Sequence, residues 1–216
     1  MATMPDKRDV HYRAGETAVL FVDMQKMFCI PGQDPGHPEM NADHYYFRRL
    51  RDLVIPNQVR ILEAARANGV HVLHTIIEAL TEDCRDASLD HKLSNLLVPK
   101  GHPLAPPIDE LAPMRNEIVL PKTSSGVFNS TNIDYVLRNL GIRYLIVAGV
   151  VTDQCVDMAV RDAADRGYMV TMPGDASATY TQERHDTALN AYKGYCWITD
   201  TDTVVARINA IAGARA

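Results

Sequence analysis

Three residues of the sequence combine reactive chemistry with a position just after an apolar run. Asp23 ends TAVLFVD, Lys122 follows EIVLP, and Cys155 lies in the first turn of a predicted helix that follows RYLIVAG. A carboxylate can take a thiol proton, and a lysine can stabilise the resulting thiolate. A helix N-terminus presents unpaired N–H groups that can lower a cysteine pKa and hold an oxyanion. Together these residue types predict nucleophilic catalysis by Cys155.

Taken one at a time, the same residues have simpler explanations. Asp23 could cap the following turn, Lys122 could be a solvated surface lysine, and Cys155 could be a buried structural thiol. The other cysteines, Cys29, Cys84 and Cys196, are scattered and form no CxxC motif. We therefore expect them to be packing thiols and predict neither a disulfide framework nor a zinc site.

The elements that must position the three residues alternate between strand-like and helix-like segments. Apolar runs predict strands at 17–23, 70–77, 117–120, 143–149, 168–172 and 196–199. Helical spacing predicts helices at 48–68, where Pro56 begins or kinks the helix, and at 132–139, 154–166, 181–191 and 200–212. This alternation predicts an α/β fold, a three-layer α/β/α sandwich with a mostly parallel six-stranded sheet. Ligands bind such sheets at the carboxyl ends of the strands, where all three residues lie.

The length fits one domain. The chain has 216 residues, and no repeat or linker divides it, so residues 1–216 are expected to form a single domain with its core at about 17–212. Residues 81–113 are polar and rich in proline. Long excursions of this kind are usually functional, so this segment is a candidate lid or subunit contact.

Charge and hydropathy disfavour several classes of protein. The 22 basic and 27 acidic residues give a net charge of -5, and nucleic-acid binders usually show a basic excess. The longest apolar run, 144–151, is too short to cross a membrane. The first residues are polar and contain no apolar signal core. We therefore expect a cytoplasmic protein that binds neither nucleic acid nor a membrane.

The motifs that carry the three residues occur in one order along the chain. They are AVLFVDMQKMFC, EIVLPKTSSGVFNST and GVVTDQCV. In this combination the sequence resembles the cysteine hydrolase branch of the isochorismatase-like superfamily. The resemblance implies a catalytic triad of Asp23, Lys122 and Cys155. It also implies a cis peptide bond between Val150 and Val151, and an oxyanion hole made by the N–H groups of Val151 and Cys155.

Departures from individual subfamilies narrow the expected activity. Isochorismatases resemble this chain but lack the nucleophilic cysteine. Nicotinamidases carry an Asp-x-His-Pro-x-x-His metal segment, where this chain has HVLHTIIEALTED. We therefore expect no metal and no other cofactor, and we interpret His71 and His74 as packing or surface residues. The remaining resemblance, including GYCWIT near the end, is to ureidoacrylate, biuret, triuret and N-carbamoylsarcosine amidohydrolases.

The resemblance predicts a hydrolase that cleaves a C–N bond of a small linear amide. The expected substrate is a carbamoyl or ureide compound of the biuret, triuret or ureidoacrylate type, cleaved through a cysteine thioester with release of ammonia or an amine. One alternative is a nicotinamidase-like aromatic amidase. Another is a non-catalytic binding or redox-sensing protein on the same scaffold. The resemblance also implies a homo-oligomer, a tetramer or a dimer.

Five further residues are predicted to contact the substrate. Phe28 and Phe128 could wall the pocket, Gln25 could hydrogen-bond a urea group, Glu78 could pair with substrate N–H groups, and Tyr192 could close the site. Core packing explains the aromatic residues equally well, a turn cap explains Gln25, and an ordinary solvated loop residue explains Glu78.

Overall fold

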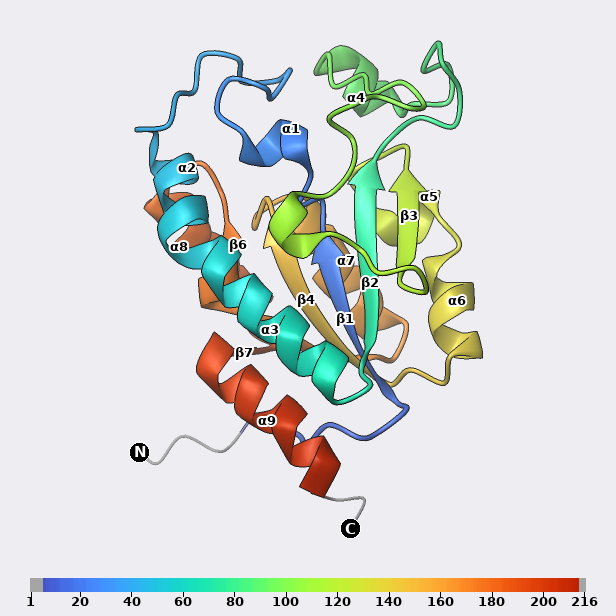
Figure 1. Ribbon diagram of the computed structural model, residues 1–216, viewed down its shortest axis with the longest axis vertical. Coiled ribbons are helices and arrows are strands. Elements are labelled where there is room, and N and C mark those ends of the chain that lie inside the picture. The colour runs from blue at the N-terminus through green and yellow to red at the C-terminus, as the bar shows by residue number, and fades with distance from the viewer. Residues whose placement is uncertain (1–5, 214–216) are drawn as a thin grey trace.

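The sheet is parallel throughout. In the computed structural model, which describes residues 6–213, the strands follow the order β3-β2-β1-β4-β5-β7, and β6 pairs with β4. Figure 1 shows this sheet in the middle of the molecule. The strands are β1 (Thr17–Val22), β2 (His71–Ile77), β3 (Ile118–Lys122), β4 (Tyr144–Val150), β5 (Met169–Pro173), β6 (Ser177–Ala178) and β7 (Trp197–Thr199).

The central strands, β1 and β4, are buried along their whole length. This matches their continuous apolar sequences, since parallel strands covered on both faces need no polar alternation. The register places Val22 opposite Gly149, so both strands end at the same level. Gly149 has a φ of 142°, and a Cβ there would lie 2.2 Å from the carbonyl oxygen of Val22. Only glycine allows the two backbones to approach so closely at the strand ends.

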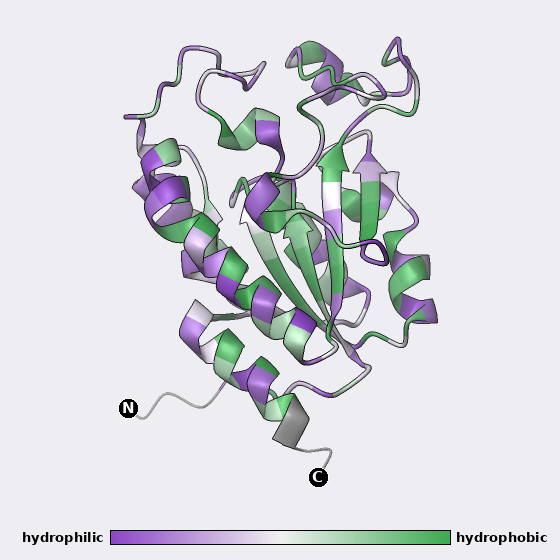
Figure 2. Cartoon of the chain, viewed as in Figure 1, coloured by the Kyte–Doolittle hydropathy of each residue, from purple (hydrophilic) through white to green (hydrophobic). Residues whose placement is uncertain are grey.

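Helices cover both faces of the sheet. On the face toward the viewer of Figure 1, α3 (Ile55–Ala67) packs against α9 (Thr201–Gly213). The other face carries α6 (Ile133–Asn139), α7 (Cys155–Asp165) and α8 (Gln182–Tyr192). Figure 2 shows hydrophobic strands in the interior and hydrophilic stripes on the outer sides of the helices. The predicted three-layer α/β/α class is confirmed.

The structure refines the predicted element boundaries. The sheet has seven strands rather than six, because β6 has only two residues and leaves no periodic signal. The helix predicted at 48–68 is a continuous helical run: α2 (Tyr45–Arg49), a π-helical turn (Leu50–Val54) and α3. Pro56 lies in the first turn of α3, directly after the π-helical turn. Three short helices were not predicted: α1 (Lys26–Cys29), α4 (Leu89–Leu93) and α5 (Val127–Ser130).

The proline-rich excursion folds back onto the carboxyl end of the sheet. It contains α4, at the upper right of Figure 1, and a 3₁₀ turn, Asp109–Leu111, which contacts α3. Backbone hydrogen bonds join Lys26 N–H to the Pro106 carbonyl at 3.0 Å and Ile108 N–H to the Met24 carbonyl at 2.9 Å. These bonds fix the excursion to the segment that follows β1, so it forms part of the wall around the strand ends.

Candidate active site

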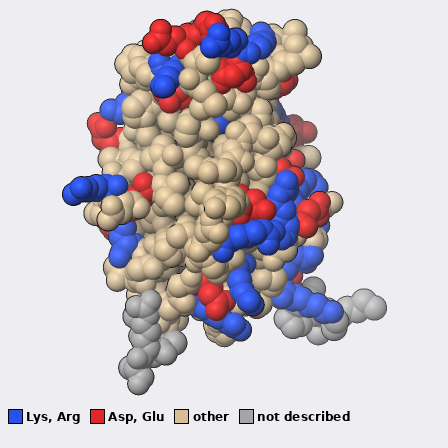
Figure 3. Space-filling model, turned by 90° about the vertical axis from the view of Figure 1, so that its right-hand side faces the viewer, with Lys and Arg blue, Asp and Glu red and all other residues tan. Residues whose placement is uncertain are grey.

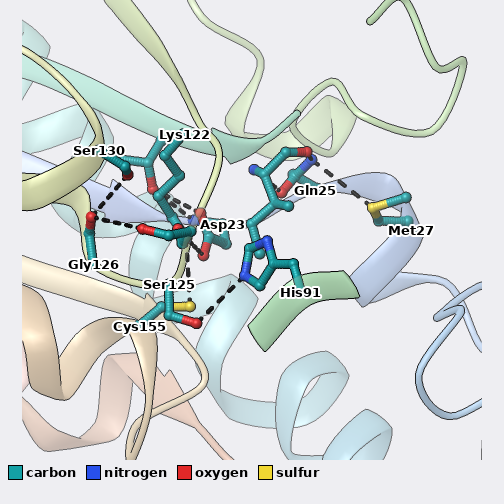
Figure 4. Close-up of polar contacts among 12 residues, drawn as sticks. Asp23, Gln25, Met27, His91, Lys122, Ser125, Gly126, Ser130 and Cys155 are labelled. Carbon is teal, nitrogen blue, oxygen red and sulfur yellow. Dashed lines mark hydrogen bonds and ion pairs between the residues drawn. The ribbon is translucent and has the colours of Figure 1, made fainter. Parts of the chain in front are cut away.

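Asp23, Lys122 and Cys155 converge at the carboxyl end of the sheet. Asp23 follows β1, Lys122 ends β3, and Cys155 begins α7. The Nζ atom of Lys122 lies 2.9 Å from Asp23 Oδ2 and 3.4 Å from Cys155 Sγ. Since β2 separates β3 from β1, a long side chain is needed to bridge the gap between them. Figure 4 shows the three side chains pointing toward one another.

Lys122 is completely buried, and its ammonium group has three polar neighbours. Besides Asp23 and Cys155, it donates a hydrogen bond to the carbonyl oxygen of Ser124, 3.0 Å away. Burial alone lowers a lysine pKa, but the neighbouring Asp23 and Cys155 outweigh it and raise the pKa of Lys122 above its usual value. The site therefore holds a fixed positive charge beside the thiol.

The backbone and side chain of Asp23 are both constrained. Its φ is 53°, in the left-handed region that aspartate tolerates better than most residues. Thr75 on β2 donates its hydroxyl to Asp23 Oδ1 at 2.8 Å. Within the described residues, Oδ2 is buried and accepts no hydrogen bond of good geometry, although it pairs with Lys122. This oxygen is available to receive a proton from a neighbouring group.

The Cys155 thiol differs from the expectation of a lowered pKa. Burial raises its pKa to about 12, and the contact with Asp23 acts in the same direction, while Lys122 opposes both. Cys155 is only 6 % exposed, so loss of hydration of the thiolate outweighs the helix N-terminus. The resting enzyme holds a thiol, and the nucleophile must be formed by proton transfer.

Two backbone N–H groups beside the thiol lack acceptors. The N–H groups of Val151 and Cys155 make no hydrogen bond to any residue that the structure describes. Gln154, which precedes α7, also provides no side-chain cap. The peptide bond between Val150 and Val151 is cis. Val151 and Cys155 line the same cavity, so their N–H groups are the candidates for an oxyanion hole.

A cavity of about 640 Å³ opens above these residues. Its floor is formed by Asp23, Val150, Val151 and Cys155, at the strand ends. Its walls come from the segment between β1 and the end of α2, the excursion, the loop after β3, the start of α7 and the segment after β6. The wall residues include Phe28, Asp34, His37, Tyr46, His91, Leu96, Ser125 and Tyr180.

Of the five residues predicted to contact substrate, the structure places only Phe28 in the cavity lining. Gln25 is fully buried, and its amide bonds backbone groups: it accepts from Ile77 N–H at 2.7 Å and donates to the Ile77 and Ala105 carbonyls. These bonds join the end of β2 to the excursion. They occupy the polar atoms that a urea group would need.

The other three predicted contacts also lie outside the cavity lining. Glu78 accepts a hydrogen bond from Gly101 N–H at 3.1 Å. Phe128 packs against Tyr168, with ring centroids 6.2 Å apart. Tyr192 is fully buried and donates its hydroxyl to the Thr152 carbonyl. These three side chains contact other protein groups instead of the cavity. Their positions along the chain could not show whether they bind the substrate or only stabilise the protein around the site.

Several cavity residues had not been identified from the sequence. His91 on α4 is 2 % exposed, and its Nε2 lies 3.4 Å from Ser125 Oγ, as Figure 4 shows. Burial and, after it, the positive charge of Lys122 lower the pKa of His91, which keeps the ring neutral near pH 7. Asp34, Tyr46 and Tyr180 form another part of the wall. No periodic pattern surrounds these residues, so the sequence offered no signal for them.

The site offers no obvious set of metal ligands. Among residues 6–213, no group of three or more His, Cys, Asp or Glu is arranged to hold a metal ion. His74 is buried within the sheet and stacks on Phe21, with ring centroids 5.5 Å apart. Burial lowers the pKa of His74 to about 4. It therefore packs as a neutral ring.

Comparisons with known proteins agree with this architecture. The chain is 28% identical over 229 residues to the ureidoacrylate amidohydrolase RutB of Rhizobium rhizogenes, covering 97% of this chain and 91% of that protein. It is 30% identical over 172 residues to the N-carbamoylsarcosine amidase of an Arthrobacter species, covering 77% of this chain and 61% of that protein.

The crystal structure of a cysteine hydrolase from Pseudomonas syringae pv. phaseolicola 1448A superposes with a TM-score of 0.79 at 25% identity, over 94% of this chain and 96% of that one. Residues 17–203 match the family model of the Isochorismatase domain. That match spans all seven strands of the sheet and the three converging residues. The chain therefore belongs to the isochorismatase family.

Proposed function

We propose that the protein is a cysteine amidohydrolase that cleaves a C–N bond of a small linear amide, with a carbamoyl or ureide compound as its substrate. The observation that carries the proposal is the position of Lys122 Nζ, 2.9 Å from Asp23 and 3.4 Å from Cys155, two residues that line the cavity. A nucleophile, a proton acceptor and a fixed cation are the components that acyl transfer requires.

Acylation begins with transfer of the Cys155 proton to Asp23. The thiolate sulfur attacks the substrate carbonyl carbon, and the negative charge moves to the carbonyl oxygen. The N–H groups of Val151 and Cys155 stabilise this oxyanion, and loss of one such donor typically costs roughly 3 kcal/mol of transition-state stabilisation. Asp23 then gives its proton to the leaving nitrogen, the C–N bond breaks, and ammonia or an amine departs.

Deacylation uses the same groups. Asp23 removes a proton from a water molecule, whose oxygen attacks the thioester carbonyl carbon. The oxyanion forms again at the same two N–H groups. The C–S bond then breaks, and the proton returns from Asp23 to the sulfur, which restores the thiol. Lys122 remains charged throughout and offsets the negative charge that moves between Asp23 and Cys155.

The buried thiol favours this enzymatic function over redox sensing. Sensor cysteines are solvent-accessible and have low pKa values. Cys155 is 6 % exposed, and burial raises its pKa to about 12. A thiol of this kind reacts when a substrate fills the cavity and a neighbouring base takes its proton. It is poorly suited to intercept an oxidant in solution.

The names of the relatives support a ureide substrate. One is called a ureidoacrylate amidohydrolase and the other an N-carbamoylsarcosine amidase. Both names denote a urea-type group, whose carbonyl carbon a cysteine can attack. An aromatic amide such as nicotinamide is the alternative substrate, and the assay below separates the two.

The test is an ammonia-release assay with purified protein on biuret, triuret, ureidoacrylate, a carbamoyl amino acid and nicotinamide. We expect at least one ureide to be cleaved, and we expect the Cys155→Ser variant to lose activity. Cys29→Ser is the matched control, because Cys29 is half-buried on α1 and does not line the cavity. A slow substrate should add the mass of its acyl group to the wild-type protein. Full turnover by Cys155→Ala would contradict the proposal.

Assembly and location remain predictions. We expect a homo-oligomer in the cytoplasm. Figure 3 shows the side of the molecule where β3 and α6 lie, and a broad band across its middle carries few charged side chains. Exposed apolar side chains on these two elements are Val119 and Tyr135. Size-exclusion chromatography with light scattering, on the wild type and on Tyr135→Lys, tests whether this face joins subunits.

No helix among the described residues has both the length and the hydropathy to span a membrane.

A further inference from the structure

The charges of the cavity lining are strongly one-sided. Five aspartates line the cavity, and no lysine or arginine does so among the residues that the structure describes. The aspartates are Asp23, Asp34, Asp90, Asp153 and Asp157. A carboxylate substrate entering this space would meet like charges on several sides.

Three of the five aspartates have a cationic partner. Asp23 pairs with Lys122. Asp153 accepts a hydrogen bond from Arg184 Nε at 2.6 Å, and Asp157 accepts one from Arg161 Nε at 2.5 Å. Their charges are largely offset within the protein, so they contribute little net attraction for a ligand.

Asp34 differs because it is buried and has no such partner. It is 4 % exposed, and no Lys, Arg or His of the described chain lies within ion-pair distance of it. Its Oδ1 accepts a hydrogen bond from Gly36 N–H at 2.8 Å. Burial raises the pKa of Asp34, while the Gly36 N–H and the nearby His37 lower it. A buried carboxylate without a counter-ion is costly, and a cationic ligand in the cavity would remove that cost.

Aromatic rings line the cavity together with this carboxylate. Tyr180 lies 4.5 Å from His37 and 5.6 Å from Tyr46, measured between ring centroids, and all three line the cavity with Asp34. Burial and then the charge of Asp34 raise the pKa of the Tyr180 hydroxyl. Aromatic faces beside a carboxylate are a typical environment for an ammonium group.

We propose that the end of the substrate remote from the scissile carbonyl is positively charged, and that Asp34 binds it within the ring cluster of His37, Tyr46 and Tyr180. This inference rests on the proposed amidohydrolase activity and specifies its substrate class as a ureide or amide that carries a protonated amine. The substrate carbonyl lies over Cys155, and the ammonium group donates to Asp34. A cavity of about 640 Å³ has room for both ends of such a molecule.

The nearest alternative is a carboxylate substrate held by Arg184. The guanidinium group of Arg184 lies 5.0 Å from the Tyr180 ring centroid. However, Arg184 does not line the cavity, and Asp153 already neutralises it. A substrate carboxylate would have to displace Asp153 from this pair.

The test uses three ureas of similar length that differ in the charge of their far end: 4-aminobutylurea, pentylurea and 4-ureidobutanoate. Their affinities for the Cys155→Ser variant are measured by calorimetry at pH 8, where an unperturbed histidine is neutral. We expect 4-aminobutylurea to bind about tenfold more tightly than pentylurea, and 4-ureidobutanoate to bind most weakly. Adding Asp34→Asn should remove the preference for the amine and leave pentylurea unchanged. Asp43→Asn, at an exposed carboxylate outside the cavity lining, is the matched control.

Equal affinity for the three ureas, tighter binding of the carboxylate, or no binding of 4-aminobutylurea would overturn the inference. So would an Asp34→Asn variant that weakens all three ligands equally, because that result indicates a structural role. Ammonia release by the wild-type protein gives a separate readout. If the ureas bind in the expected order and none is cleaved, the proposed hydrolase activity fails while the charge preference stands.

Discussion

The floor and the walls of the cavity are built in different ways. The floor lies at the ends of long parallel strands: Asp23 follows β1, Cys155 follows β4 after a short turn, and Lys122, which ends β3, contacts both from beneath the cavity lining; all three are buried. Of the wall residues, Asp34 lies in the loop after α1, His91 lies on the short helix α4, and Tyr180 follows the two-residue strand β6. The floor has matched charges, with Lys122 bonded to both of its partners. The walls carry a buried carboxylate with no cation beside it.

From this difference we expect the floor to carry out the reaction and the walls to determine which substrate binds. Strand register determines where the floor groups lie, since Val22 faces Gly149 on one side and Thr75 on the other. A change in the floor therefore alters the sheet as well as the reaction. The wall residues are attached to segments whose conformation can vary without moving the strands. We therefore expect floor variants to lose both stability and turnover, and wall variants to change affinity.

The largest effect is expected from breaking the Asp23–Lys122 pair. Asp23→Asn or Lys122→Met should lower kcat/KM by at least about 10³-fold. Each variant should also lower the free energy of unfolding by roughly 3–5 kcal/mol, because it leaves an uncompensated buried charge. Ammonia release and guanidinium denaturation measure the two effects.

The double variant Asp23→Asn/Lys122→Met sharpens this test. Removing both charges leaves no unpaired ion, so the double variant should be more stable than the sum of the two single losses predicts. It should remain inactive. Strictly additive stability losses would show that the two groups are not coupled, and recovered activity would remove them from the mechanism.

The distinction between floor and walls also explains what the sequence could predict. Asp23, Lys122 and Cys155 stand at the ends of strongly apolar runs, so their convergence followed from the rule for parallel sheets. The α/β class and the approximate positions of the main strands along the chain followed from the same periodicity. Asp34 and His91 have no comparable signal, because their positions depend on how the loop after β1 and the excursion fold back. Gln25 and Tyr192 are close to the motifs in sequence, yet their side chains bond backbone groups outside the cavity.

The second prediction concerns how the stability of the protein depends on pH in the acid range, through two buried histidines. Burial lowers the pKa values of His74 and His185 to about 4, against 6.5 when unfolded. His185 supports the floor, because its Nδ1 lies 2.9 Å from Thr152 Oγ1. Below pH 6.5 these two histidines become protonated in the unfolded chain but stay neutral in the folded chain. The free energy of unfolding therefore falls as the pH drops and levels off near pH 4.

The expected loss is roughly 3 kcal/mol per histidine between pH 6.5 and pH 4. Guanidinium denaturation across this range measures it. His74→Phe should flatten part of the pH dependence, because a phenyl ring suits the stacked position against Phe21 and takes up no proton. An unchanged slope in this variant would show that His74 does not contribute.

The third prediction uses Gln25, which is adjacent to the floor but does not line the cavity. Gln25→Leu removes three hydrogen bonds to Ile77 and Ala105, and leaves their buried backbone groups without partners. We expect a loss of about 1–3 kcal/mol in the free energy of unfolding. The ranking of substrates in the ammonia assay should not change. A changed ranking of substrates would indicate that Gln25 contacts the substrate.

The smallest effect is expected at His91, on the opposite wall from Asp34. The neutral ring offers one donor and one acceptor beside Ser125, but it takes no charge or proton in the reaction. His91→Asn keeps hydrogen-bonding capacity and removes the ring, so KM should rise about tenfold, a loss of about 1.4 kcal/mol in binding, with kcat within about threefold. His71→Asn, at the start of β2 and so at the far end of that strand, is the matched control and should change neither constant. If His91→Asn instead lowered kcat as much as Asp23→Asn does, His91 would belong with the floor, and the division between chemistry at the strand ends and affinity at the loops would fail.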